Sequence, residues 1–275
     1  MLGSLTEADD AIQEAWLRAS RAGASDVDNL AGWLTTIVAR VCLNMLRSRS
    51  RRREEALSVH LPDPVITAEG ELQPEDEALL ADQVGLALLV VLDSLSPAER
   101  LAFVLHDMFE LPFDEIAPMV GRSPVATRQL ASRARRRVRE AEIPTPDPDL
   151  ARQRQVVDAF FQAAREGDFD ALLRILHPDV ILRSDFGAKH RAASVVYRGA
   201  DAVARQARGF PGALVTPALV NGAAGAVVTV RGRPIAILGF TVVDGTIVAI
   251  DGIADPERVR RVAAAVLGDD PRNQA

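Results

Sequence analysis

The chain contains a single cysteine, Cys42, and a single lysine, Lys189, among its 275 residues. One cysteine excludes an internal disulfide and a cysteine-cluster metal site. Aromatic residues make up only 4% of the chain, so alanine, valine and leucine must fill the cores. No apolar run is long enough to span a bilayer, and no signal peptide follows Met1. We therefore expect a cytoplasmic protein of two or three domains that does not associate with membranes.

Acidic residues outnumber basic ones overall, but positive charge is locally concentrated. The net charge is −6 and the pI about 5.4, so any nucleic-acid site must be local. Arginine is dense in two stretches, 47–53 and 122–139, and no acid interrupts the second. A solvated basic helix is the simpler interpretation of such a stretch. Clustering this tight on an acidic chain favours contact with DNA.

Residues 95–139 predict a helix-turn-helix motif. Ser96 and Glu99 form a capping box at the start of the first helix. A short second helix ends at Gly121, since glycine is favoured just past a helix. Ser123, followed by proline, caps the third helix.

The third helix is predicted to carry the DNA contacts. A narrow inward stripe repeats at helical spacing through Thr127, Ala131, Ala134 and Val138. Arginine, glutamine and serine side chains suit phosphates and base edges in a major groove. The predicted DNA-contacting residues are Arg122, Ser123, Arg128, Gln129, Ser132, Arg133, Arg135 and Arg136.

Two further helices are predicted before this motif. The first, within residues 2–19, could be capped by Thr6 and resembles an ordinary amphipathic helix with an acidic surface. Its apolar side is predicted to hold Ala11, Ile12, Ala15, Trp16 and Leu17. Its opposite face carries Asp9, Asp10, Gln13 and Glu14. The second helix follows the cap Asn29, and its apolar residues are Leu30, Trp33, Leu34, Ile37, Val38, Val41 and Met45.

The order of these segments resembles the sigma factors of bacterial RNA polymerase, specifically the small extracytoplasmic-function group. Residues 9–18 resemble the region-two segment that docks on the β′ clamp helices, which implies polymerase contacts by Asp9, Asp10, Gln13 and Glu14. Residues 33–53 resemble the segments that melt and read the −10 element. Residues 95–139 resemble region four, which reads the −35 element, and the family implies the β flap as another partner.

The resemblance implies a set of −10 contacts on the second helix. These are Trp33, Arg40, Asn44, Arg47 and Arg51. Family members usually have another helix before residues 9–18, so we expect region two to be incomplete at its N-terminal end. Asn44 also stands where the family commonly has an acid. Both departures bear on the strength of −10 recognition.

The chain after residue 141 changes character. Residues 142–150 alternate proline and acid, which predicts a stiff linker. Helices are expected at 155–165, 170–176 and 201–208. Four β-branched runs follow at 214–220, 226–231, 234–243 and 246–253, separated by Asn221-Gly222, Gly232-Arg233 and Asp244-Gly245. These hairpin signals predict an antiparallel sheet in an α+β cone.

Residues 160–182 resemble the SnoaL-like branch of the NTF2-like fold. A sigma factor with such a domain resembles the SigJ-like subgroup, whose DGGGK-type and NPDKL-type motifs are matched loosely by residues 185–189 and 255–259. Residues 60–64, HLPDP, resemble the subgroup's WLPEP linker motif. The resemblance implies that this domain regulates the sigma part within the same chain.

The linker before region four is more apolar than a passive tether requires, so we expect it to pack on the sheet or near residues 255–259. The predicted interdomain residues are Leu61, Pro62, Asp63, Pro64, Asp255 and Pro256. A long helix is expected from Pro74. The predicted divisions are region two at 1–57, a linker at 58–73, region four at 74–141, a linker at 142–150 and the SnoaL-like domain at 151–275.

The sequence therefore predicts a multidomain protein, with all-α sigma regions two and four followed by an α+β NTF2-like cone. It would bind core RNA polymerase, promoter DNA and its own C-terminal domain, without a cofactor or metal, and would not be an enzyme. One alternative is an NTF2-like cyclase or isomerase fused to a DNA-binding module; its acid or base candidates are His177, Asp185, His190 and Asp251. His177 precedes a proline at a helix end, which favours a structural cap. Another alternative is a DNA-binding regulator that acts without polymerase.

Overall fold

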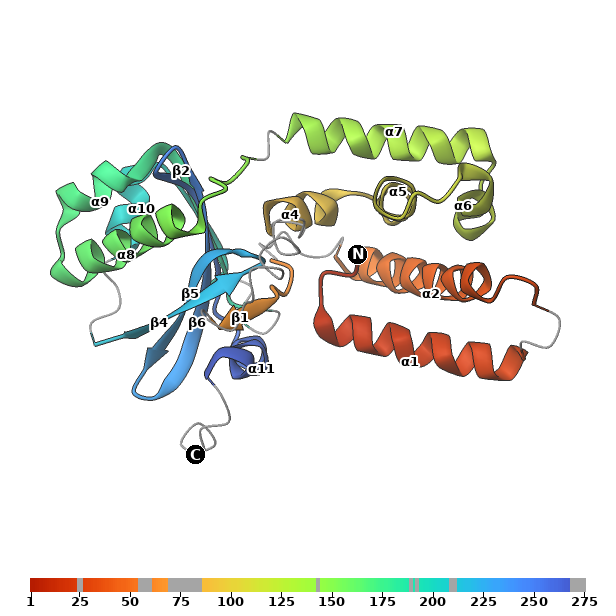
Figure 1. Cartoon of the computed structure of the whole chain (residues 1–275), viewed down its shortest axis with the longest axis horizontal. Helices are drawn as coiled ribbons and strands as arrows, with labels where there is room; N and C mark the ends of the chain where they lie inside the picture. The colour runs from red at the N-terminus through yellow and green to blue at the C-terminus, as the bar shows by residue number, and fades with distance from the viewer. Residues whose placement is uncertain are drawn as a thin grey trace. The chain divides into compact units, whose positions relative to one another are not determined.

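The computed structural model describes residues 1–23, 27–53, 61–68, 86–141, 144–187, 190, 193–207 and 212–267 (Figure 1). The chain forms two units, each built from two separate stretches. The first contains Met1–Leu57 and Leu88–Ile143, and the second contains Ser58–Ala87 and Pro144–Ala275. The segment predicted as the linker before region four thus belongs with the C-terminal unit.

The first unit is helical in all its described elements. They are α1 (Leu5–Ala22), α2 (Leu30–Arg53), α4 (Leu86–Ser94), α5 (Pro97–Phe103), the π-helix η1 (Val104–Met108), α6 (Phe113–Val120) and α7 (Pro124–Glu140). The long helix expected from Pro74 is described only from Leu86, because its earlier part lies outside the described residues.

Local capping sets most of these boundaries. The Ser4 hydroxyl accepts a hydrogen bond from the Glu7 amide at 3.3 Å, so the prediction that Thr6 caps α1 was wrong. The Asn29 side chain accepts from the Gly32 amide at 2.9 Å and begins α2, as predicted. The Ser96–Glu99 capping box is present, and Gly121 ends α6 with φ of 73°, which confirms both predictions.

The apolar side of α1 differs from the prediction. Its buried residues are the small ones, Ala11, Ala15 and Ala19. Ala11 and Ala15 pack against the α2 residues Val41, Cys42 and Leu46. Ile12, Trp16 and Leu17 are instead exposed to 63%, 71% and 48%. Small alanine side chains at the contact allow α1 to lie close to α2. Because the alanines occupy the buried side, the large apolar side chains of α1 face outward.

The predicted apolar face of α2 was also partly wrong. Leu30, Leu34 and Val38 are exposed, whereas Ala39 and Leu43 are buried. These two residues join a core formed with Leu101, Leu105, Ile116, Met119 and Val120 of the helix-turn-helix. α2 therefore packs against two neighbours, so its buried surface is wider than one stripe.

The second unit is an α+β domain around a seven-stranded sheet of order β1-β4-β5-β6-β7-β2-β3. Its strands are β1 (Ile66–Ala68), β2 (Leu176–Asp185), β3 (Val195–Arg198), β4 (Leu214–Val220), β5 (Ala223–Val230), β6 (Arg233–Val243) and β7 (Thr246–Ile253). Its helices are α8 (Leu150–Glu166), α9 (Phe169–Ile175), α10 (Ala200–Ala207) and α11 (Pro256–Leu267). Helices α8, α9 and α10 lie on one side of the sheet (Figure 1), where Phe160 and Phe161 pack against Phe240. The expected fold class is confirmed.

The three hairpin turns place two consecutive residues at positive φ, as two-residue turns with a primed geometry require. The pairs are Asn221-Gly222, Arg231-Gly232 and Asp244-Gly245. The middle turn therefore lies one residue earlier than predicted. The sheet is also not purely antiparallel, because β2 pairs in parallel with β7.

Two further expectations need correction. Residues 66–68 are not linker but a strand, β1, which pairs antiparallel with β4. Residues 255–259, which we expected to form a loop, instead cap and begin α11. Within the described part of the chain, no helix is both long and apolar enough to cross a membrane.

Candidate nucleic-acid interface and linker clasp

The register of α7 separates a buried edge from an arginine-rich face. Thr127, Ala131 and Ala134 are fully buried, and Val138 is half-buried, which confirms the predicted inward stripe. Ser123 caps the start of α7. Its hydroxyl accepts a hydrogen bond from the Ala126 amide at 3.2 Å, which satisfies one of the free amide groups of the first turn. Most of the remaining positions face solvent, whereas Ala126, Leu130 and Arg135 are half-buried.

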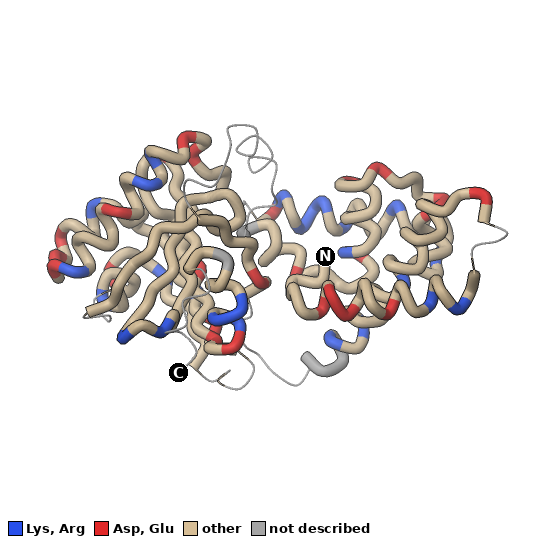
Figure 2. Tube along the Cα trace, turned by 60° about the horizontal axis from the view of Figure 1, so that its bottom comes forward, with Lys and Arg blue, Asp and Glu red and all other residues tan. Residues whose placement is uncertain are grey.

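Most of the predicted −35 candidates are exposed. These are Arg122, Ser123, Arg128, Gln129, Ser132, Arg133 and Arg136. Arg135 differs, because its Nε donates to the Asp107 carboxylate at 2.6 Å and its side chain is only 35% exposed. The Arg128 guanidinium lies over the Phe113 ring, 5.4 Å from the ring centre, which orients it before any DNA binds. In Figure 2, the arginines of α7 and the acids of α1 fall on separate stretches of the trace.

The predicted −10 candidates share one face of α2. With 3.6 residues per turn, five positions fall within about 40° of one line along the helix. They are Trp33, Arg40, Asn44, Arg47 and Arg51. Arg40, Asn44 and Arg47 are exposed, and Trp33 is half-buried. One Arg47 nitrogen also donates to the Val120 carbonyl at 3.5 Å, and the Arg51 side chain lies outside the described set.

The acidic candidates of α1 form a mixed surface. Asp9, Asp10, Gln13 and Glu14 are all exposed. The exposed side chains of Ile12 and Trp16 lie on the same helix, although the sequence placed them in the core. This surface offers both negative charge and apolar area, which suits a protein partner.

Residues 61–68, which we call the strap, lie against the C-terminal domain. The Leu61 amide donates to Asp185 Oδ2 at 2.8 Å, and the Leu61 carbonyl accepts from Arg258 Nη2 at 2.6 Å. Leu61, Pro62 and Pro64 are buried. Proline has no backbone N–H group. Burying Pro62 and Pro64 therefore leaves no unpaired amide donor at these two positions.

The other half of the strap extends the sheet. The Val65 amide donates to Asn221 Oδ1 at 2.9 Å, and the Asn221 amide donates back to the Val65 carbonyl at 2.8 Å. Ile66 then pairs with Val220 as β1 begins. Asn221 thus serves both the hairpin turn and the strap, a role the sequence did not reveal.

Four charged residues, which we call the clasp, hold the strap: Asp63, Asp185, Arg258 and Arg261. Arg258 donates from Nε to Asp63 and from Nη1 to Asp185 Oδ2, the latter at 2.7 Å. Arg261 Nη2 donates to Asp63 Oδ2 at 3.2 Å. Both carboxylates are buried. Burial alone would lower the pKa of Arg258, but the Asp63 and Asp185 charges outweigh it and raise that pKa above its usual value.

Local structure explains how the clasp is positioned. Asp255 caps α11 by accepting from the Arg258 amide at 2.9 Å, and residues three apart on a helix share a side. Arg258 and Arg261 therefore point toward the same carboxylate. Gly187 has φ of 80°, and a Cβ there would come within 1.8 Å of Asp255 Oδ2. Only glycine allows this close approach between the 185–189 and 255–259 motifs.

The predicted interdomain residues are thus distributed unevenly. Leu61 to Pro64 lie in the strap, Asp255 caps the helix that supplies the clasp arginines, and Pro256 borders a cavity. Sequence reasoning missed Arg258 and Arg261, although both lie in or beside the 255–259 motif. The available signal was two arginines three positions apart, a spacing that places both side chains on one side of a helix.

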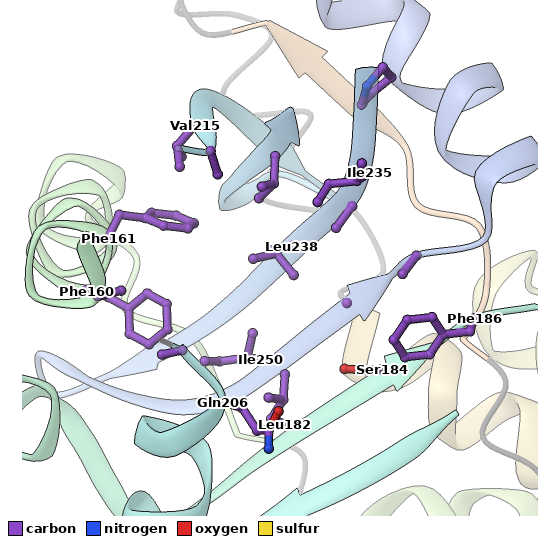
Figure 3. Close-up of a pocket in the computed structure, with 18 of the residues that line it drawn as sticks. Phe160, Phe161, Leu182, Ser184, Phe186, Gln206, Val215, Ile235, Leu238 and Ile250 are labelled. Atoms are coloured by element: carbon purple, nitrogen blue, oxygen red, sulfur yellow. The ribbon is translucent and has the colours of Figure 1, made fainter. Parts of the chain in front are cut away.

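The C-terminal domain contains a cavity of about 1760 Å³ that is partly open to solvent (Figure 3). The four acid or base candidates, His177, Asp185, His190 and Asp251, do not line it. Asp251 forms an ion pair with Arg183 on the sheet, and this carboxylate raises the pKa of Arg183 although burial opposes the rise. His177 Nδ1 accepts from the Asp179 amide at 3.2 Å, a local structural bond. None of the four candidates of the enzyme alternative is therefore placed in the cavity.

A helix-turn-helix with an exposed arginine face, a second basic helix and an appended α+β domain define a multidomain DNA-binding transcription factor. The family models for Sigma-70 region 2 and Sigma-70, region 4 match residues 1–52 and 85–138. The chain is 38% identical over 273 residues to the ECF RNA polymerase sigma factor SigJ of Mycobacterium tuberculosis, covering 94% of this chain and 87% of that protein. It is 39% identical over 203 residues to the probable ECF sigma factor SigI of the same species, covering 74% and 68%.

Structural comparison agrees with the sequence comparison. The crystal structure of M. tuberculosis SigJ matches with a TM-score of 0.70 and 34% identity, covering 96% of this chain and 92% of that one. The chain therefore belongs to the extracytoplasmic-function sigma factors of RNA polymerase. Family membership groups it with transcription factors rather than with enzymes.

Proposed function

We propose that this sigma factor reads two promoter elements with two separate helices and is regulated by its own C-terminal domain through the strap. The observation that carries the first part is the pair of exposed basic faces on α7 and α2 of a chain whose net charge is −6. A single DNA-reading helix would account for one such face only.

On α7, Arg128, Gln129 and Ser132 are the candidates for base edges in the −35 element. Arginine and glutamine can each make two hydrogen bonds to a base edge, which gives sequence discrimination. Arg133 and Arg136 are candidates for phosphate contacts, which add affinity without sequence preference. The ion pair of Arg135 with Asp107 favours a role in holding α7 in place.

We assign polymerase binding to α1 and to region four. The acidic and apolar surface of α1 is the candidate for the β′ clamp helices, and region four is the candidate for the β flap. Because polymerase acts in the cytoplasm, the protein would work there. A DNA-binding regulator that acts without polymerase would need no surface of this kind.

Transcription with purified components tests this function. The protein and core polymerase should elute together and give specific transcripts from a genomic promoter library. Arg128→Ala should reduce specific transcription, whereas Arg174→Ala, which changes an exposed arginine on α9, should not. If the protein neither elutes with core enzyme nor directs a specific start, the polymerase-dependent function is refuted.

Regulation by the C-terminal domain follows from the position of the strap in the chain. Arg53 ends α2 and Leu86 begins α4, so regions two and four are joined by a long connection. A docked strap divides that connection into two tethers, which reach at most about 29 Å and about 65 Å at 3.6 Å per residue. Without docking, the whole connection reaches about 120 Å. Docking therefore limits how far region two can move from the C-terminal domain, whereas the short connection between α7 and α8 already limits region four.

Clasp variants test this regulation. Asp63→Ala and Arg258→Ala should each change the rate of promoter-specific transcription several-fold, because either change removes a buried ion pair. Asp179→Ala, which removes an exposed acid of the same domain, should leave the rate unchanged. If all three variants transcribe at the wild-type rate, the C-terminal domain does not regulate through the strap.

A further inference from the structure

The cavity in the C-terminal domain is larger than a folding core requires. Its volume of about 1760 Å³ exceeds the roughly 300–1,000 Å³ common for small-molecule pockets. Figure 3 shows side chains from helix α8, helix α10 and several strands of the sheet pointing into it. Residues of α11 line it as well. Such a space, lined from several elements, is suited to a bound molecule.

Aromatic side chains are concentrated around this cavity. The chain has only nine phenylalanines and one tyrosine, yet Phe160, Phe161, Phe186 and Tyr197 all line it. Aromatic rings prefer offset or edge contacts with other rings. A ligand with rings would find such contacts from both α8 and the end of β2.

Among the residues that the structure describes, the cavity offers almost no charge to a buried ligand. The charged residues that border it, Arg165, Glu166, Arg233 and Arg260, are all exposed to solvent. An ionised group buried away from them would lose its hydration without a partner. The buried part of the ligand must therefore be uncharged.

Ser184, Tyr197 and Gln206 bring uncharged polar groups to the cavity, and the Ser184 hydroxyl can orient such a ligand. Ser184 is half-buried, lines the cavity and is labelled in Figure 3. None of the other described residues makes a hydrogen bond with its hydroxyl. A hydroxyl can donate or accept, so it fits one polar substituent on an otherwise apolar molecule.

The cavity and the clasp share two structural elements. On β2 and just after it, Ser184 and Phe186 line the cavity while Asp185 between them binds the strap. On α11, Arg260 and Ala263 border the cavity while Arg258 and Arg261 hold Asp63. A molecule that fills the cavity therefore contacts the two elements on which the strap depends.

We propose that this cavity binds an uncharged, ring-bearing apolar small molecule and that its occupancy changes strap docking through β2 and α11. The second half rests on the regulatory function proposed above. Coupling of this kind is reciprocal, so releasing the strap must change ligand affinity by the same factor as ligand changes strap docking.

Binding is tested with N-phenyl-1-naphthylamine, a neutral fused-ring probe whose fluorescence rises in apolar surroundings, added to the full-length protein. Saturable binding of one probe per chain is expected, and sodium decanoate, an acyl chain with a charged end, should compete poorly. Val195 lines the cavity, whereas its neighbour Val196 is 40% exposed and faces away. Val195→Gln should weaken probe binding at least five-fold, and Val196→Gln should not.

Both valines lie on the edge strand β3, so both variants should unfold at the wild-type temperature, which thermal unfolding checks. Absence of saturable binding, equal effects of the two variants or preferential binding of decanoate would each overturn the site or its ligand class. Probe affinity should also differ several-fold between the wild type and Asp63→Ala. Identical affinities would overturn the coupling alone, whereas the transcription rate of Asp63→Ala tests the regulatory function independently.

Discussion

Removing Arg258 should release the strap without unfolding the domain that holds it. In the docked state, Arg258 is the partner of two buried carboxylates and of the Leu61 carbonyl. Arg258→Ala leaves the ion pair between Asp63 and Arg261 in place. It removes the guanidinium that binds both Asp63 and Asp185, so the two negative charges repel each other in the docked state. When the strap undocks, both carboxylates become hydrated again. The substitution should therefore weaken the free energy of docking and leave the free energy of unfolding of the domain largely unchanged.

The size of the effect follows from the burial of the pair. Breaking a buried ion pair by deleting one partner costs about 3–5 kcal/mol. At about 1.4 kcal/mol per factor of ten, the equilibrium constant for docking should fall by roughly two to three and a half orders of magnitude. Arg258→Lys retains the charge but not the fork-shaped donor, so its effect should be intermediate.

Amide hydrogen exchange on the full-length protein measures this change directly. The Leu61 and Val65 amides donate to Asp185 and Asn221, so both should exchange slowly in the wild type. In Arg258→Ala they should exchange far faster while β5 to β7 stay protected. Arg260→Ala changes an exposed arginine of the same helix and should leave the strap protected. Unchanged strap protection, or loss of protection across the whole sheet, would refute this reasoning.

Three other results are expected. Arg128→Ala should lose discrimination between DNA sequences by about 1–3 kcal/mol if Arg128 makes a bidentate base contact, whereas Arg139→Ala should weaken binding to all sequences and reduce its salt dependence; equal effects on a DNA panel would exclude base reading by Arg128. Burial would raise the pKa of Glu99, but hydrogen bonds from Ser96 and nearby arginine charges lower it overall. Glu99 therefore stabilises the fold above its unfolded pKa of about 4.3, and the stability loss in Glu99→Gln should shrink as the pH falls through the lower folded pKa, as urea titrations at several pH values can show. Burial raises the pKa of Cys42, so its thiol should react slowly with a disulfide reagent at neutral pH and speed up only when denaturant unfolds region two.

Features that depend on neighbouring residues could be predicted from the sequence. The Ser96–Glu99 box, Gly121 and the turn at Asp244 each depend on the few residues around them, so their patterns are readable. The apolar side of α1 could not be predicted reliably, because alanine and large apolar residues both recur at helical spacing. Which of them faces α2 depends on how closely the two helices approach, and the sequence does not contain that distance.

The clasp could not be predicted because its members are distant in sequence. Arg258 and Asp63 are 195 positions apart, and nothing local in either stretch identifies the other. Asp185 was interpreted as a catalytic candidate because a carboxylate near an apolar strand looks the same in both roles. The parallel pairing of β2 with β7 has the same cause, since strand order depends on contacts between remote segments.

The pairing of β1 with β4 also determines when the strap can dock during synthesis. Val65 and Asn221 are 156 positions apart, and a ribosome adding about 5–20 residues per second needs roughly 8–30 s to cover that distance. The described helices α1 to α7 are complete before the strap's binding surface exists. Each newly made molecule thus passes through an interval in which its first unit can fold while the surface that holds the strap is still being translated.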